Sequence, residues 1–171
     1  NINETESMFA KMQVCQDACA EYNQMKPSDF NGRTAKIKQI FKKTGEMIWV
    51  ASPVYCGMGE HIEVGNNFFV NPNCFFMDLA DIKFGDNVWI GPNVGFYTSG
   101  HSIDPNRREA GYGYAFPITV GDNVWFGAGS IVVPSRPSGI TIGKNSVIAA
   151  GTVVNKDVPE NVLVAGNPFR I

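Results

Sequence analysis

Imidazole side chains are scarce in this sequence, and their positions limit the chemistry that it can support. The chain contains two histidines, His61 and His101. Imidazole is the side chain best suited to accept a proton near neutral pH, as group transfer to a hydroxyl requires. His101 stands where a regular repeat gives way to a long polar loop, so we expect its ring to project into a cleft. His61 precedes a predicted strand, and we expect a solvated or packing residue.

The four cysteines are a second set of reactive side chains. Cys15 and Cys19 are four residues apart, on one face of a predicted helix. Two metal ligands would fit that spacing, but small core residues are the simpler interpretation. Cys56 and Cys74 lie three repeat units apart, so we expect them at equivalent corners of adjacent coils, as reduced thiols.

The element that must position these residues is a six-residue repeat. Each unit opens with an aliphatic or aromatic residue, and steps such as Gly-Asp-Asn supply residues that tolerate positive φ at corners. A period this short is typical of a β-solenoid, in which coils bury their apolar faces by stacking. The sequence therefore predicts a mainly β solenoid. The units open at Val64, Val70, Phe76, Phe84, Ile90, Phe96, Val120, Phe126, Ile142, Ile148 and Val154.

Helical periodicity precedes the repeat and predicts a helical segment over residues 1–46, before a solenoid over 47–171. Pro27 ends the first helix, and Ser28 or Asp29 caps a second helix that runs to about Lys43. The residues expected to face inward from it are Phe30, Ile37, Ile40 and Phe41. The first helix has its apolar residues on one face, namely Met8, Met12, Cys15, Cys19 and Tyr22.

The repeat is interrupted twice. Between residues 101 and 117 the composition turns polar and Gly-rich, and the repeat then returns in phase. A long loop that leaves a rigid scaffold is more often functional than a mere connection between elements. A shorter irregular stretch covers 133–139 and is expected to bulge from the solenoid wall.

Taken together, these features resemble one known family. The repeat units, the segment Ser99-Gly-His-Ser-Ile-Asp-Pro-Asn-Arg-Arg and the ending Gly166-Asn-Pro-Phe-Arg are similar to the maltose and galactoside O-acetyltransferases, which are hexapeptide-repeat acyltransferases. The resemblance runs from about Tyr22 to Ile171. It implies a left-handed parallel β-helix, a homotrimer and acetyl-CoA as donor. The left hand follows from the resemblance alone, since parallel crossovers in general are right-handed in about 98% of cases.

The resemblance also implies roles for individual residues. It makes His101 the catalytic base and Asn71 the donor to the oxyanion, and it places Asp78 and Trp125 at the acceptor. Family members often carry a Glu near the position of Tyr112 that could orient the base; here Glu109 or a backbone carbonyl are the alternatives. For acetyl-CoA, the implied contacts are Ala128, Ala150, Asn155, Lys156 and Arg170.

Composition excludes several other classes of protein. Fourteen basic and sixteen acidic residues among 171 give a net charge of −2, with no basic stripe for nucleic acid. No apolar run is long enough to cross a bilayer. The polar, acidic first residues are unlike a secretory leader, so we expect a cytoplasmic protein.

The leading hypothesis is an acetyl-CoA-dependent O-acetyltransferase that acts on a sugar or glycoside hydroxyl by direct transfer. An antibiotic or amino-sugar acceptor is an alternative within the same chemistry. A zinc hydratase on the same scaffold would need three gathered imidazoles, which two histidines cannot supply, and we expect no metal requirement. A non-catalytic trimeric scaffold is the alternative from a different class.

Overall fold

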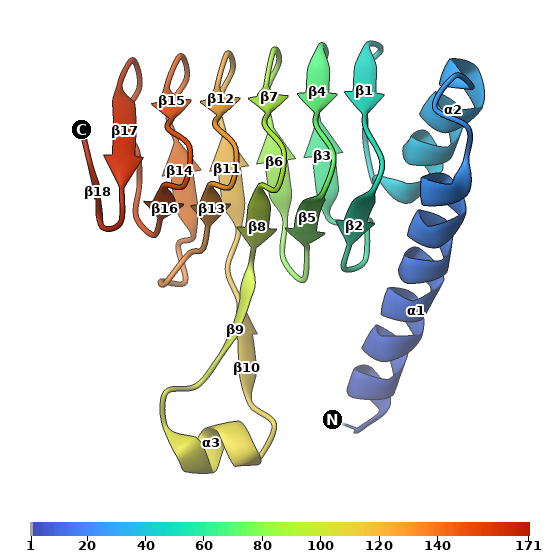
Figure 1. Cartoon of the computed structure of the whole chain (residues 1–171). Coiled ribbons are helices and arrows are strands. Elements are labelled where there is room, and N and C mark those ends of the chain that lie inside the picture. Colours follow the sequence, from blue (N-terminus) through green and yellow to red (C-terminus); the bar gives the residue numbers. More distant parts are fainter. Residues whose placement is uncertain (1) are drawn as a thin grey trace.

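The computed structural model describes residues 2–171, in which helices α1 (Ile2–Gln24) and α2 (Phe30–Ile40) stand at one end of a β-solenoid of about six turns (Figure 1). Asp29 caps α2, because its Oδ1 accepts the backbone N–H of Gly32 at 3.0 Å. The second helix ends earlier than the predicted Lys43. At Phe41 the backbone turns extended, and this residue is buried against the first coil.

The buried face of the helical segment matches the prediction in part, since Met8 and Met12 of α1 are only half-buried. Cys15, Cys19 and Tyr22 are buried as expected. Phe30, expected inside, is 56% exposed and rests on Trp49 with ring centroids 5.2 Å apart. It is the first residue of the helix. Arg33 is buried instead, and its guanidinium donates to the Tyr22 hydroxyl at 2.9 Å.

The solenoid has three parallel faces, which the chain visits in the same order in every coil. The first face contains β3 (Ile62–Val64), β6 (Ile82–Phe84), β11 (Ile118–Val120) and β14 (Ile140–Ile142). The second face contains β1 (Ile48–Val50), β4 (Phe68–Val70), β7 (Trp89–Ile90), β12 (Trp125–Phe126), β15 (Val147–Ile148) and β17 (Leu163–Gly166), with β18 (Phe169–Arg170) antiparallel to β17. The third face contains β2 (Val54–Cys56), β5 (Cys74–Met77), β8 (Gly95–Tyr97), β13 (Ile131–Val132) and β16 (Val153–Val154).

The core runs along the axis of the coils, and it confirms the solenoid predicted from the repeat. Every residue that opens a repeat unit is buried. Aromatic rings stack from coil to coil: the Phe76 and Phe96 centroids are 5.3 Å apart, and Phe96 meets Phe126 edge-on at 5.1 Å. Removing one such side chain from water contributes about 1.5–3 kcal/mol, so stacked coils stabilise one another.

The three faces are joined by three corners of different character. The asparagine corner joins the first face to the second and comprises residues 65–67, 85–88, 121–124, 143–146 and 159–162. The loop corner joins the third face to the first and comprises residues 57–61, 78–81, 98–117, 133–139 and 155–157. The remaining corner, between the second and third faces, is called the middle corner.

The asparagine corner is a continuous ladder of side-chain hydrogen bonds. Its asparagines have φ between 57° and 60° in the inner coils, a region that asparagine tolerates well. Each amide bonds the next at 2.8–3.0 Å. The ladder consists of Asn67, Asn87, Asn123, Asn145 and Asn161.

The register of the third face corrects one prediction about the cysteines. Cys74 pairs with Val54, and Cys56 pairs with Phe76. The two cysteines therefore lie in strands and are not equivalent, because each coil here is longer than three repeat units. All four cysteines are free thiols. None of the described helices is apolar over enough residues to cross a membrane.

Candidate functional site

The largest elaboration of the loop corner is an arm formed by residues 99–115. Strand β9 (Ser99–His101) leaves the third face and β10 (Gly113–Ala115) returns antiparallel to it, with helix α3 (Pro105–Glu109) at the tip. Figure 1 shows the arm projecting away from the solenoid. The interruption predicted as a loop over 101–117 is therefore an ordered hairpin that carries a short helix.

The tip of the arm is closed by local polar contacts. Asp104 caps α3 by accepting the backbone N–H of Asn106 at 2.9 Å. Arg108 donates to the carbonyl oxygens of Ser102 at 2.9 Å and Ile103 at 3.2 Å. Arg107 lies over the Tyr112 ring, 5.4 Å from its centroid. These contacts order the tip without help from the solenoid.

His101 is the last residue of β9, where the arm turns toward α3, and it lies beside a cavity of about 380 Å³. Its ring is exposed, and its cross-strand partner is Gly113. A Cβ at Gly113 would lie 3.8 Å from His101 Nδ1, so glycine leaves that side of the imidazole open. The cavity lining is His101, Ser102, Ile103, Asp104, Arg107, Tyr112, Gly113, Tyr114, Phe116 and Ser135.

Aromatic packing fixes the base of this cavity. Tyr114 and Phe116 stack with centroids 4.6 Å apart and an interplanar angle of 15°. The Tyr114 ring lies against the backbone of Gly100, where any Cβ would collide with it. The glycine before His101 thus lets the two strands of the arm pack closely and aims the imidazole at the cavity.

Ser135 brings the second irregular stretch into the same site, which sequence analysis did not anticipate. Arg136 folds the stretch back, since its guanidinium pairs with Asp157 and its Nε donates to the Gly139 carbonyl at 3.3 Å. The Ser135 hydroxyl lies 3.4 Å from the Asn155 carbonyl oxygen. The sequence did contain one indication of this contact: residues 133–139 interrupt the repeat at the same corner as the arm, one coil further on.

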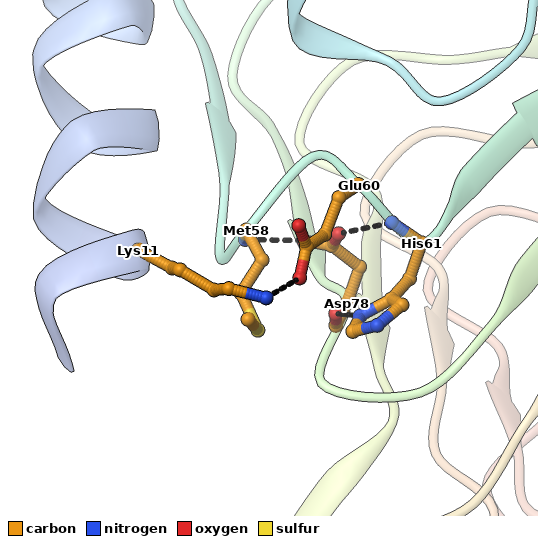
Figure 2. Close-up of polar contacts among 5 residues, drawn as sticks. All are labelled: Lys11, Met58, Glu60, His61 and Asp78. Carbon is orange, nitrogen blue, oxygen red and sulfur yellow. Dashed lines mark hydrogen bonds and ion pairs between the residues drawn. The ribbon is translucent and has the colours of Figure 1, made fainter. Parts of the chain in front are cut away.

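Asp78 is buried beneath the loop corner. Its side chain is fully buried, and its carboxylate accepts the backbone N–H groups of Met58 at 2.8 Å and His61 at 3.3 Å (Figure 2). Burial raises the pKa of this carboxyl above its ordinary range, although these N–H groups act in the opposite direction. The carboxylate therefore holds two turns of the loop corner together, and its contact with a sugar acceptor stays a prediction.

His61 belongs to the same buried arrangement. Its Nδ1 lies 2.7 Å from the Asp78 carbonyl oxygen, which can only accept, so Nδ1 carries the proton. Figure 2 shows this contact beside the ion pair of Lys11 with Glu60, at 2.7 Å, which ties α1 to the same corner. Of the two alternatives expected for His61, a solvated or a packing residue, this contact fits the second.

Asn71 and Trp125 are accessible from outside. Asn71 is half-buried at the middle corner, and its Nδ2 donates to the Ile90 carbonyl at 3.0 Å, which leaves the second amide hydrogen free to donate. Trp125 is 54% exposed and belongs to an aromatic row on the second face, aligned strand to strand. The aromatic row consists of Trp49, Phe69, Trp89 and Trp125.

The residues implied for acetyl-CoA fall into two groups. Ala128 and Ala150 are exposed on adjacent coils of the middle corner, where the Gly151 N–H donates to the Ala128 carbonyl at 2.9 Å. Such small side chains leave room for an extended chain along the wall. Near the C-terminal end, exposed Lys156 lies over the Phe169 ring at 4.9 Å from its centroid. Asn155 and Arg170 are exposed in the same region.

The chain alone does not assemble all predicted residues in one cavity. The lining around His101 includes none of the other predicted site residues, although Ser135 connects it to Asn155. Across residues 2–171, no group of three or more His, Cys, Asp or Glu is arranged to hold a metal ion. The site as described offers an exposed imidazole, an amide donor and small wall residues, which suit acyl transfer.

Comparisons with known proteins agree with this chemistry. Residues 4–45 match the maltose acetyltransferase hexapeptide capping motif, and residues 117–156 match the hexapeptide repeat of succinyl-transferase. The galactoside O-acetyltransferase of Escherichia coli is 44% identical over 151 residues, which cover 88% of this chain and 72% of that protein.

Solved structures show the same relationship. The crystal structure of a maltose O-acetyltransferase from Clostridium difficile superposes with a TM-score of 0.92 and 41% identity, covering 96% of this chain and 86% of that one. A galactoside acetyltransferase in complex with coenzyme A gives a TM-score of 0.91 and 41% identity, covering 96% of this chain and 80% of that one.

Proposed function

The chain belongs to the hexapeptide-repeat acetyltransferase family of the galactoside and maltose O-acetyltransferases, and from that membership we propose that it moves the acetyl group of acetyl-CoA to a hydroxyl of a sugar or glycoside. The observation that carries the proposal is the position of His101. An exposed imidazole faces a cavity of about 380 Å³ within an ordered arm, where a hydroxyl can reach it.

In the proposed reaction His101 acts as general base. It takes the proton of the acceptor hydroxyl as that oxygen attacks the thioester carbonyl carbon. The C–S bond then breaks, and coenzyme A leaves as a thiol after taking a proton. The transfer is direct, so no acetylated side chain forms. General-base catalysis of this kind contributes about 10² to 10⁴ in rate.

Asn71 is proposed to stabilise the oxyanion. Its free amide hydrogen is a neutral donor that cannot compete with His101 as a base. One such donor is worth about 10² to 10³ in kcat. Because Asn71 does not line the His101 cavity within one chain, the two residues meet only if the catalytic unit is larger than the chain or if the arm repositions.

We further propose a homotrimer, which supplies such a larger unit. The aromatic row leaves Trp49, Phe69, Trp89 and Trp125 between 37% and 55% exposed along one face. A contiguous apolar surface of this kind marks an interaction site on a soluble protein. A projecting arm and an apolar face on each subunit suit an assembly in which every site lies between two chains.

For acetyl-CoA, we propose that Ala128 and Ala150 line the path of the pantetheine arm. Asn155, Lys156 and Arg170 then lie toward the nucleotide end, where cations suit phosphate groups. For the acceptor, we propose that Trp125 contacts the sugar, since an exposed indole can stack on a sugar ring. The buried carboxylate of Asp78 instead fixes the loop beneath the site.

The test is thiol release from acetyl-CoA across glucosides, galactosides, maltose, amino sugars and hydroxylated antibiotics, with coenzyme A binding measured in parallel. We expect release that depends on one glycoside class. If thiol release depends instead on an antibiotic or an amine, the acceptor differs from the one proposed, while acetyl transfer from acetyl-CoA remains the reaction. If the protein binds no coenzyme A and releases no thiol with any acceptor, a trimeric scaffold replaces the enzyme.

A further inference from the structure

Three of the four cysteines meet where the helical segment packs on the solenoid. Cys15 and Cys19 lie one turn apart on the buried face of α1, and Cys56 lies in β2, against which α1 packs. Their exposed fractions are 5%, 3% and 3%. Cys19 and Cys56 both line a cavity of about 190 Å³, together with Tyr55 and Phe75 of the third face.

The three thiols change one another's protonation. The neighbouring Cys15 and then Cys56 lower the pKa of the Cys19 thiol, and the charge of Lys36 acts in the same direction. The contact with Cys19 raises the pKa of the Cys15 thiol, while the contact with Cys56 acts in the opposite direction. The contacts with Cys15 and Cys19, together with burial, raise the pKa of the Cys56 thiol. Two thiols thus remain protonated and can donate to the third. Cys19 is the thiol most readily converted to thiolate, the form that reacts as a nucleophile.

Cys74 provides an internal comparison. It is fully buried, and its thiol donates to the carbonyl oxygens of Asn71 and Gly91, each at 3.2 Å. Burial is the first cause that raises its pKa, to about 11. A thiol held by carbonyl acceptors in an apolar core is inert, whereas a thiol beside two thiol donors and a cavity is not.

We propose that Cys19 and Cys56 form an oxidation site for hydrogen peroxide, which joins α1 to the first coil through a disulfide. The Cys19 thiolate attacks one oxygen of the peroxide, and the O–O bond breaks. Hydroxide departs as the leaving group, and Cys19 becomes a sulfenic acid. The Cys56 thiol then attacks that sulfur, and water leaves. The net reaction consumes one peroxide and two thiols and yields one disulfide and two waters.

The geometry selects both the partner and the oxidant. Cys15 and Cys19 follow each other along one helix face, so their Cβ atoms point in parallel and do not converge as a disulfide needs. Cys56 approaches from another element and shares the cavity with Cys19. The cavity of about 190 Å³ that these two cysteines line admits hydrogen peroxide but is too small for a bulky disulfide such as oxidised glutathione. Cys15 is a positioning residue that donates to Cys19.

In the test, the reduced chain is treated with hydrogen peroxide under native conditions. The product is then analysed by intact mass and by peptide mapping without reductant. We expect a loss of two hydrogen atoms, a crosslink between the peptides of Cys19 and Cys56, and reversal by dithiothreitol. Cys19 should react at least about tenfold faster than Cys74, in line with their thiolate character. Oxidised glutathione at equal concentration should give little crosslink.

Matched variants keep the proposal open to refutation. Cys19→Ser and Cys56→Ser should each abolish the crosslink, and Cys74→Ser should retain it. If the serine variants do not fold, the map of the parent protein decides alone. The proposal fails if the parent shows no crosslink, if Cys19 proceeds to sulfinic acid without one, if Cys15 replaces either partner, or if Cys74 reacts as fast as Cys19. None of these readouts depends on acetyl transfer.

Discussion

The asparagine corner and the loop corner are built from the same coils, yet they differ in every local property. At the asparagine corner each turn has nearly the same length and the same left-handed asparagine, and each amide bonds its neighbour at 2.8–3.0 Å. At the loop corner the turns vary from residues 155–157 to 98–117. Nearly all the elaborations of the solenoid are therefore stacked on one edge.

The difference shows how a repeat scaffold separates stability from chemistry. The faces and the asparagine corner set the register of every coil, so the opposite edge can change length without disturbing the core. His101 and Ser135 come from that free edge, and Asp78 and His61 support it from below. Variants of His101 and Ser135 should accordingly change the kinetics, whereas variants of the asparagine ladder should change unfolding alone.

The largest expected effect is on the rate. His101→Ala should lower kcat by about 10² to 10⁴ while the thermal midpoint stays unchanged, because an exposed general base contributes to the reaction and little to packing. His61→Ala is the matched control, since it removes an imidazole from the same corner. It should keep most of the rate and lower stability by about 1 kcal/mol through the lost bond to Asp78. Equal rate losses would refute the assignment.

The second effect is on unfolding. Asn123→Ala removes two ladder bonds, with Asn87 and Asn145, and places alanine at φ 58°. We expect a loss of about 2 kcal/mol in the free energy of unfolding, with kcat unchanged. Denaturant titration measures the loss. Asn123→Gly tolerates the positive φ but does not restore the ladder bonds, so its free energy of unfolding should lie between those of the parent and Asn123→Ala. If Asn123→Gly is as stable as the parent, the ladder bonds contribute nothing.

A smaller effect is expected where the second irregular stretch meets the cavity. Ser135→Trp should fill the space beside His101 and raise the acceptor KM by about tenfold, as steric changes in a binding pocket do. Ser138→Trp adds the same bulk at an exposed position that does not line the cavity, and it should behave like the parent. Steady-state kinetics on both variants decide the point. Identical KM values would mean that the acceptor binds elsewhere.

The same contrast explains what could be predicted from sequence. The residues that open the repeat units were all placed correctly, because each has the same local environment in every coil. Handedness came only from the family resemblance, as no residue of the repeat specifies it. The predicted equivalence of Cys56 and Cys74 was wrong because the coil is longer than three units, and only the observed register shows that Cys74 pairs with Val54.

At the loop corner, contacts between coils made individual residues unpredictable. The burial of the Asp78 carboxylate could not be predicted, because the N–H groups of Met58 and His61 that bind it belong to the preceding coil. The role of Ser135 depends on the fold-back that Arg136 and Asp157 create. Helix α3, in contrast, had a readable signal in Asp104-Pro105, an N-cap followed by proline at the first helical position.

The smallest effect concerns two aspartates of the loop corner with opposite pKa shifts. Burial raises the pKa of Asp78, so the native state binds its proton more tightly than the unfolded chain does. Its contribution to stability is complete below the ordinary aspartate pKa and is lost as pH rises through the raised native value. The unfolding free energy of the parent, relative to Asp78→Asn, should therefore fall as pH rises through that window.

Asp157 should show the reverse slope. The backbone N–H of Thr141, 2.8 Å from its Oδ1, is the first cause that lowers its pKa, and Arg136 adds to it. Its contribution is present above the ordinary aspartate pKa and disappears as pH falls through the lowered native value. Relative to Asp157→Asn, the parent should therefore gain stability as pH rises across the range just below the ordinary pKa. Denaturant titrations at a series of pH values compare the two variants directly. Slopes of the same sign would mean that Asp78 is less well shielded from water than its burial indicates, and the loop corner would then resemble the exposed asparagine corner more closely.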